Sequence, residues 1–300
     1  MMDKKTGRSI IMNHTQEKVV SLRWAIGLSS LLALLKTISG LTCSSATLLA
    51  SALDSLMDTG VSSVNYLSVR KASKPPDDDH AYGHEKIESL ASYTQGIIIF
   101  VFAFLILGDT IRRTWARNIV FHSEVAVATI ILSAVINLFL TSILHRAGSK
   151  TDSLILKAEK AHYSMDILSY AVILVALLLV KWSGWSFWDL LGGVLLAIYV
   201  AYLAARILLQ AGSELVDRSL AKRALDELDT LIRKQPGVLS YHQMRTRKAG
   251  AKTFIDFHLV LEPEQTFEEA HEITESLIEK IGTRFENADI TVHEDPRGGR

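Results

Sequence analysis

The stretch AHYSMDILSYAVILVALLLV, residues 161–180, carries His162 and Asp166 at the head of a continuous apolar run. A helix needs about 20 such residues to cross the roughly 30 Å of hydrocarbon in a bilayer. The two polar residues are spaced i, i+4, so both side chains point the same way from one helix. An ionisable residue at bilayer depth costs roughly 2.5–3.5 kcal/mol on insertion scales, so this pair requires a functional explanation.

A second pair with the same spacing lies earlier in the chain. Asp54 and Asp58 occur in ALDSLMD, residues 52–58, within another stretch long enough to cross a membrane. Three carboxylates and one imidazole from two rigid helices can surround one tetrahedral divalent cation, and Zn²⁺ fits this donor set best. The alternative is that these side chains only form hydrogen bonds between helices. Two pairs of identical spacing favour the metal site.

The remaining apolar residues extend this pattern to a whole membrane domain. The chain has 300 residues, of which 49% are hydrophobic, and they are clustered rather than spread. We predict six membrane helices, at residues 19–41, 45–68, 90–112, 123–145, 155–181 and 187–209. Lysine and arginine are concentrated in the segments on the N-terminal side of the membrane, which predicts that both termini are cytoplasmic.

The character of the sequence changes after the last apolar run. Residues 214–235 are charged and amphipathic, and two strand-like runs follow at 238–246 and 253–261, joined by a predicted hairpin turn at 248–250. A helix at 266–281 precedes a strand at 288–293. The order α-β-β-α-β predicts a small open-faced α+β domain. The predicted organisation is a polar N-terminal tail (1–18), a six-helix membrane domain (19–212), a soluble cytoplasmic domain (213–296) and a disordered tail (297–300).

Further candidate ligands lie outside the membrane segments. Asp77, His80 and His84 occupy the loop after the second helix, where they form either an exposed zinc site or an acidic loop that attracts cations generally. The C-terminal region carries a second set, which is either a metal site or scattered surface histidines: His242, His258, His271, His293 and Asp295. Imidazoles with a carboxylate suit Zn²⁺, Cd²⁺ or Fe²⁺ better than Mg²⁺ or Ca²⁺.

Composition excludes several classes of function. The net charge is zero and no basic patch indicates nucleic acid. The single cysteine rules out a zinc site made of thiolates. No Gly-x-x-x-x-Gly-Lys-Ser/Thr run for ATP occurs, no organic cofactor is expected, and six apolar segments exclude a soluble enzyme. Because ligands must lose protons to coordinate a metal, an empty membrane site should hold protons that metal displaces, which predicts metal/proton exchange.

From about Lys18 to Pro296 the chain resembles the cation diffusion facilitators. The resemblance is carried by Asp-x-x-x-Asp at 54–58, His-x-x-x-Asp at 162–166, Asp-Asp-x-His-x-x-Gly-His-x-Lys at 77–86 and His-x-Asp at 293–295. The Asp-Asp/His-Asp composition looks like that of the bacterial subgroup that transports zinc and cadmium, some members of which also move Fe²⁺. The resemblance implies six membrane helices, a ferredoxin-like (metallochaperone-like) cytoplasmic domain and a homodimer.

The resemblance also implies roles for the candidate residues. Asp54, Asp58, His162 and Asp166 would form the transport site, and Asp77, His80 and His84 a loop site. The C-terminal histidines with Asp295 would form a binuclear site, with Asp295 as the bridging ligand. Lys86 and Asp217 match a charge pair between the two domains.

The function expected from residues and resemblance together is metal export. We expect a homodimeric antiporter of the bacterial inner membrane that exports Zn²⁺, or Cd²⁺ or Fe²⁺, against protons by alternating access. Zn²⁺ would also be a regulatory ligand of the cytoplasmic domain. Two alternatives remain open at this point: a membrane-anchored metal sensor or scaffold that acts through its C-terminal domain, and a channel without proton coupling.

Overall fold

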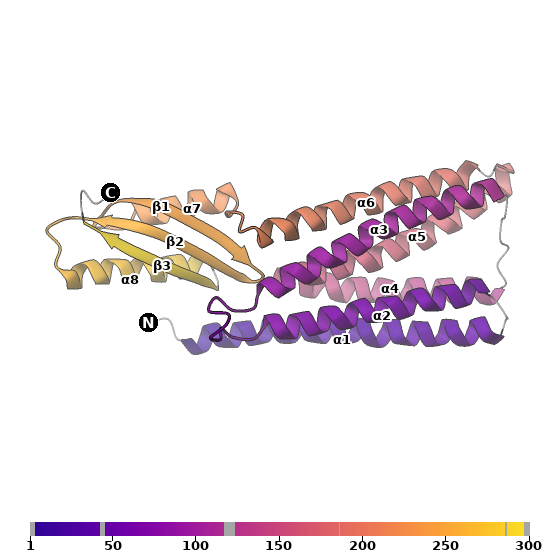
Figure 1. The fold of residues 1–300 in the computed structure, drawn as a ribbon, viewed down its shortest axis with the longest axis horizontal. Coiled ribbons are helices and arrows are strands. Elements are labelled where there is room, and N and C mark those ends of the chain that lie inside the picture. Colours follow the sequence, from indigo (N-terminus) through magenta and orange to yellow (C-terminus); the bar gives the residue numbers. More distant parts are fainter. Residues whose placement is uncertain (1–3, 43–45, 117–123, 186, 286, 297–300) are drawn as a thin grey trace. The chain divides into compact units, whose positions relative to one another are not determined.

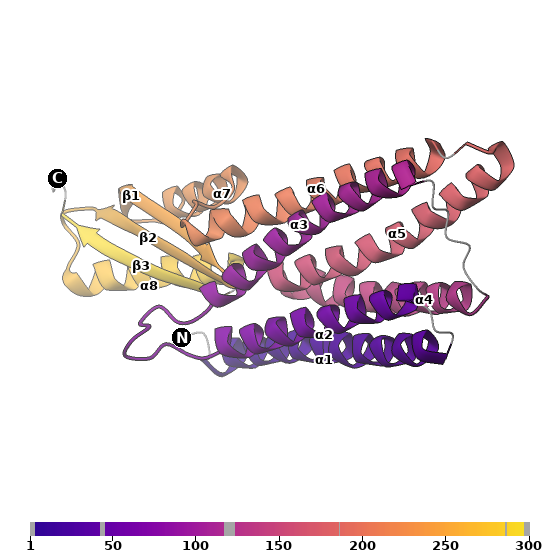
Figure 2. The same cartoon turned by 45° about the vertical axis from the view of Figure 1, so that its right-hand side comes forward.

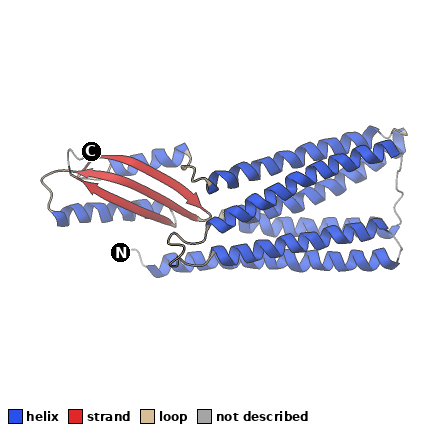
Figure 3. Ribbon diagram, viewed as in Figure 1, coloured by secondary structure: helices blue, strands red, loops and turns tan. Residues whose placement is uncertain are grey.

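The structure, a computed structural model, describes residues 4–42, 46–116, 124–185, 187–285 and 287–296. The chain divides into two compact units, one of residues His14–Gly212 and one of Met1–Asn13 with Ser213–Arg300. Figure 1 labels the elements, and Figure 3 distinguishes the all-helical unit from the unit that contains the sheet. The predicted disordered tail at 297–300 lies outside the described residues.

Six long helices carry the apolar runs: α1 (Lys4–Thr42), α2 (Ala46–Ala72), α3 (Lys86–Ala116), α4 (Glu124–Thr151), α5 (Leu154–Ser183) and α6 (Phe187–Leu215). All but α2 are long and apolar enough to cross a membrane. With 27 residues α2 has the length, but Asp54, Asp58 and many hydroxyl-bearing residues lower its hydropathy. The predicted helical membrane domain is confirmed, and the one long helix that falls short in hydropathy is the one that carries the first candidate ligand pair.

The segment predicted as a polar N-terminal tail is helical instead, because α1 begins at Lys4 rather than near residue 19. Hydropathy marks only the apolar part of a helix, and no proline interrupts the polar residues before it. Lys18 shows how the polar part is held: its amino group forms a buried ion pair of 2.7 Å with Glu88 at the start of α3. The polar segment therefore continues the membrane helix.

Two apolar cores meet at α5, which places its polar residues between them. One core joins α5 to α1, α2 and α4, through Leu22, Ala25, Val69, Leu140, Leu144, Ala147, Ile155, Leu156 and Tyr163. The other joins α5 to α3 and α6, through Ile99, Ala103, Met165, Leu196, Val200 and Ala204. Figure 2 shows α1, α2 and α4 running together, with α3 beside α6. Large apolar side chains remain exposed on the outer faces, where a bilayer would cover them.

The second unit is the predicted α+β domain. Its elements are α7 (Lys222–Arg233), β1 (Val238–Ala249), β2 (Lys252–Leu261), α8 (Phe267–Arg284) and β3 (Ala288–Asp295). The sheet has the order β1-β2-β3, with β1 antiparallel and β3 parallel to β2. Apolar residues of α7 and α8 pack on the face of the sheet that presents Ile255, Phe257 and Leu259. The opposite face of the sheet carries the polar residues that alternate with these apolar residues along the strands.

Two details of this unit differ from the prediction. The charged stretch 214–235 is not one helix, because α6 ends at Leu215 and Asp217 adopts a positive φ of 56° before α7 begins. The hairpin loop is Gly250-Ala251, since Ala249 pairs with Lys252, whereas the turn was predicted at 248–250. Gly250 has a φ of 56°, in the left-handed region that glycine enters at no steric cost.

Candidate metal centres

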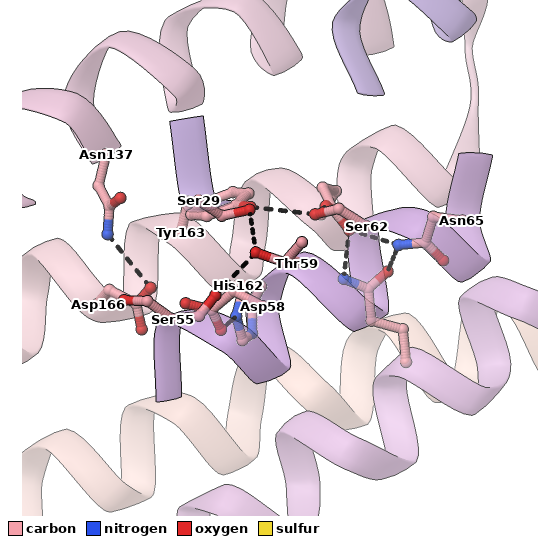
Figure 4. Close-up of polar contacts among 12 residues, drawn as sticks. Ser29, Ser55, Asp58, Thr59, Ser62, Asn65, Asn137, His162, Tyr163 and Asp166 are labelled. Atoms are coloured by element: carbon pink, nitrogen blue, oxygen red, sulfur yellow. Dashed lines mark hydrogen bonds and ion pairs between the residues drawn. The ribbon is translucent and has the colours of Figure 1, made fainter. Parts of the chain in front are cut away.

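The membrane cluster consists of Asp58 on α2 with His162 and Asp166 on α5. One ligand atom from each of the three residues lies within 4.8 Å of the others. His162 Nε2 is 2.8 Å from Asp58 Oδ1, and the imidazole is buried. Figure 4 shows the His162 ring facing Asp58, with Asp166 one turn further along α5. The i, i+4 spacing thus brings a carboxylate and an imidazole from α5 to one aspartate of α2.

The cluster is close to the size that a zinc ion requires. Zinc is bound at about 2.0–2.2 Å by nitrogen and oxygen, so donors on a tetrahedron around it lie roughly 3.3 Å apart. The candidate donor atoms, all within 4.8 Å of one another, need only a small contraction to reach that spacing. Nε2 of His162 is the nitrogen that faces the carboxylates, since Nδ1 is buried without a hydrogen-bond partner in the described part of the chain.

Asp54, the fourth predicted ligand, does not belong to this group. It lies one turn before Asp58 on α2, and its side chain is exposed. The structure therefore brings together three of the four residues predicted for the membrane site. Asp54 would have to move toward the other three to complete a tetrahedral set.

Asn137 on α4 supports the cluster and was not predicted. Its Nδ2 donates to Asp166 Oδ2 at 3.3 Å, and its Oδ1 is buried without a hydrogen-bond partner among the described residues. Figure 4 shows the amide reaching Asp166 from the neighbouring helix. Outer groups of this kind orient ligands and tune their affinity for metal. The sequence feature that could have identified Asn137 is a single amide side chain inside an apolar run.

A buried carboxylate next to the cluster was also missed. Glu159, one turn before His162 on α5, accepts hydrogen bonds from the Ser62 hydroxyl and the Asn65 amide, and from Gln95 Nε2 at 2.9 Å. The Ser62 hydroxyl also lies 3.1 Å from the Tyr163 hydroxyl. These contacts tie α2, α3 and α5 together, and Figure 4 shows the chain of polar side chains that leads from this network toward the cluster.

The loop cluster consists of Asp77, His80 and His84, whose ligand atoms also lie within 4.8 Å of one another. Asp77 Oδ1 is 3.0 Å from His80 Nδ1, and Asp77 Oδ2 is 3.3 Å from His84 Nε2. Loss of hydration raises the pKa of Asp77, but hydrogen bonds from His80 and the charges of both imidazoles outweigh it and lower that pKa. A carboxylate held ionised between two imidazoles is able to bind a cation.

The sheet cluster is produced by strand register. His242 on β1 pairs with His258 on β2, which pairs with His293 on β3, so the three imidazoles form a row across the sheet. Asp295 lies two residues beyond His293 and therefore faces the same side. A register shift just after His242, where Gln243 has a φ of 52°, marks an irregularity that changes the local direction of β1.

Asp295 is the shared partner in this row. Its Oδ2 is 3.0 Å from His258 Nδ1 and 3.1 Å from His242 Nε2, whereas its Oδ1 is 3.2 Å from His293 Nε2. The hydrogen bond from His258, with the charges of the three imidazoles, lowers the pKa of Asp295. His271, predicted with this set, lies on α8 with an exposed side chain and is not part of the group.

The predicted pair of Lys86 and Asp217 joins residues of the two separate units and stays a prediction. Within its own unit, the Asp217 carboxylate accepts a hydrogen bond from Arg247 at 3.2 Å.

Comparison with known proteins places both units in one family. The profile of the "Cation efflux transmembrane domain" matches residues 22–216, and that of the "Cation efflux protein, cytoplasmic domain" matches residues 220–297. The cation-efflux pump FieF of Shewanella oneidensis is 34% identical over 274 residues, covering 91% of this chain and 92% of that protein. FieF of Escherichia fergusonii is 33% identical over 288 residues, covering 95% of each chain.

Two solved structures are similar to part of the chain. The Zn form of CzrB is 28% identical, with a TM-score of 0.27, and covers 28% of this chain and 97% of its own. The metal-bound C-terminal domain of the CzcD transporter from Thermotoga maritima is 24% identical, with a TM-score of 0.25, and covers 27% and 98%. The matched profiles span nearly all of the sequence, and the curated relatives are similar along almost their whole length. The chain is therefore a member of the cation efflux family, the cation diffusion facilitators, and is a membrane transporter rather than an enzyme.

Proposed function

We propose that this transporter exports Zn²⁺ in exchange for protons, with Cd²⁺ and Fe²⁺ as further substrates. The observation that carries the proposal is the cluster that Asp58 of α2 forms with His162 and Asp166 of α5, in which the imidazole is buried and both carboxylates are half-buried. An imidazole among carboxylates suits zinc and its softer neighbours, whereas Mg²⁺ and Ca²⁺ prefer oxygen alone. The curated relatives are named cation-efflux pumps, which agrees with a metal ion as cargo.

The fourth ligand gives the site a way to open and close. Asp54 lies one turn from Asp58 and outside the present cluster, so a small shift of α2 along α5 would bring it in or release it. With Asp54 the metal is held by four donors, and without it by three. During alternating access, the same site would then alternate between a form with four donors and a form with three.

Proton coupling follows from the chemistry of the ligands. Carboxylates and imidazole must be deprotonated to bind metal, so binding expels whatever protons the empty site holds. Three carboxylates close together in a low dielectric favour protonation when the metal has left. Each transport cycle would therefore carry metal in one direction and protons in the other.

The two clusters outside the membrane are proposed to regulate or supply the transport site. The loop cluster is suited to collect cations, and the row of histidines with Asp295 is suited to bind regulatory metal and tighten a homodimer. The transporter is proposed to lie in the bacterial inner membrane with both termini in the cytoplasm, as the distribution of lysine and arginine predicts.

Reconstituted transport tests this proposal. The wild type in proteoliposomes should take up Zn²⁺ at a rate that rises with an imposed pH gradient, and Asp58→Ala should remove that uptake. Asp109→Asn is the matched control, because Asp109 is an exposed membrane-helix carboxylate paired with Arg112 on α3. Zinc uptake that ignores the pH gradient contradicts the antiport, and indicates a channel.

The sensor alternative is favoured by one observation, the preformed row of histidines with Asp295 in the soluble unit. A sensor would lose function when His258 is replaced and keep it when Asp58 is replaced. A transporter behaves in the opposite way. The same flux assay on His258→Ala and Asp58→Ala therefore separates the two functions.

A further inference from the structure

Lys36 is a buried cation inside the membrane unit and is not one of the proposed ligands of the transport site. It lies near the end of α1, with only 4% of its surface exposed. Its amino group donates to Ser55 Oγ at 2.8 Å and approaches the Ser51 carbonyl oxygen at 3.5 Å. A lysine at this depth is costly unless other groups compensate its charge.

The groups that compensate Lys36 are those of the transport site. Ser51, Asp54, Ser55 and Asp58 are spaced i, i+3, i+4 and i+7 and therefore form one stripe on α2. The ammonium that contacts both serines of the stripe lies against the face that carries both aspartates. Among the carboxylates that act on its charge, Asp58 contributes most, followed by Asp166 of α5 and then Asp54.

The charges of this set balance when metal is bound. Once Asp54 has joined Asp58 and Asp166, three ionised carboxylates with a neutral imidazole and a divalent cation leave one negative charge in the membrane interior. The Lys36 ammonium brings that sum to zero. A net charge in low dielectric is strongly disfavoured, so a neutral loaded site is the form best suited to move between the two sides. Glu159 is separate from this set, because Ser62, Asn65 and Gln95 hold its carboxylate.

We propose that Lys36 is the built-in counter-charge of the transport site, which neutralises the loaded site and weakens its hold on metal enough for release. The inference rests on the proposed function, because it assumes that Asp58, His162 and Asp166 bind the transported ion. In the empty site the ammonium stays tethered to Ser55. When metal enters, it repels the metal and so limits the affinity.

Zinc binding to the full-length protein tests this role. The relevant signal in calorimetry is the binding step that Asp58→Ala removes. Lys36→Gln keeps a hydrogen-bond donor but lacks the charge, so it should tighten that step on the order of tenfold and slow zinc turnover in proteoliposomes. Lys36→Arg should keep wild-type affinity. Ser55→Ala removes the anchor but not the charge, and should leave the affinity within about twofold of the wild type.

The outcomes separate this inference from the proposed function. Tighter binding and slower turnover in Lys36→Gln, together with unchanged binding in Ser55→Ala, support the counter-charge. If Lys36→Gln binds zinc as weakly as the wild type or more weakly, while Asp58→Ala still removes the step, the counter-charge is wrong and the transport site stands. If Asp58→Ala removes no binding step at all, the proposed transport site itself is wrong.

Discussion

The membrane cluster and the sheet cluster contain the same kinds of side chain, aspartate and histidine, but they are assembled in different ways. In the sheet, register places three histidines side by side, and both oxygens of Asp295 are already within 3.2 Å of imidazole nitrogens. In the membrane, the three ligands come from two separate helices, and the fourth candidate, Asp54, is outside the group. One cluster is fixed by backbone hydrogen bonds, whereas the other depends on the relative position of two helices.

This difference fits two different tasks. A site held by a β-sheet is preorganised for metal, which suits the regulatory binding proposed for it. A site divided between helices changes its affinity when they shift, as a transport site requires. The buried hydrogen bond between Glu159 on α5 and Ser62 on α2 links the same two helices and would resist that shift.

The largest expected effect is the loss of zinc transport when a carboxylate of the membrane cluster is removed. Asp166→Ala removes a direct ligand of the membrane site and should lower zinc transport more than about 100-fold, beyond the loss caused by an outer-shell partner. The measurement is zinc uptake into proteoliposomes under a fixed pH gradient, with Asp109→Asn as control. Transport that survives in Asp166→Ala would show that the membrane cluster does not carry the metal.

A smaller effect is expected for Asn137→Ala, because Asn137 contacts a proposed ligand, Asp166, and is not a proposed ligand itself. The loss of its hydrogen bond should weaken zinc binding at the membrane site by about tenfold, at the low end for such partners. Zinc titration of the full-length protein measures this. Ser142→Ala is the control, since Ser142 lies on α4 with its hydroxyl bonded to the Leu138 carbonyl. Equal affinities in both variants would exclude an orienting role for Asn137.

Asp295→Ala should affect regulation more than transport. It removes the shared partner of the sheet histidines, so zinc should no longer raise the unfolding temperature of the cytoplasmic unit within the full-length protein. For an intact site that stabilisation is about 2.7 kcal/mol at 100 times the Kd. Transport at saturating zinc should fall by no more than about fivefold, the low end of coupling between sites. Asp289→Asn is the matched control, because Asp289 lies on β3 but pairs with Lys252. A greater loss of transport than in Asp166→Ala would reverse the two roles.

The smallest effect is expected at the loop. His80→Ala should lower the initial rate of zinc uptake by about twofold, and only at low zinc, because a cluster with two exposed ligands, Asp77 and His80, raises the local cation concentration without forming the transport ligands. Asp79→Asn, in the same loop but outside the cluster, provides the comparison. A reduced rate at saturating zinc would instead assign the loop a step in transport.

The pattern of apolar residues was sufficient to predict the helices and the α+β domain. The i, i+4 spacing identified the three residues that the structure brings together in the membrane unit, Asp58, His162 and Asp166, but also included Asp54, which lies outside the group. Neither pattern predicted the row in the sheet, because the register that aligns His242 with His258 depends on a hairpin loop and an irregular strand. The helical start of α1 was not predicted because hydropathy does not detect the polar part of a helix. Lys36, Asn137 and Glu159 were missed because a single polar residue gives no sign of its partner until helices pack. Lys36 nevertheless lies inside a predicted membrane helix, and a charged residue at such a position indicates a functional site.

The most direct test of the membrane site is X-ray absorption on zinc bound to the full-length protein in which the loop and sheet histidines are replaced by alanine. The account predicts one zinc ion with a first shell of four nitrogen and oxygen donors at about 2.0 Å, including a single imidazole that disappears in His162→Ala. Zinc that binds with no imidazole, or with one that survives in His162→Ala, would contradict it.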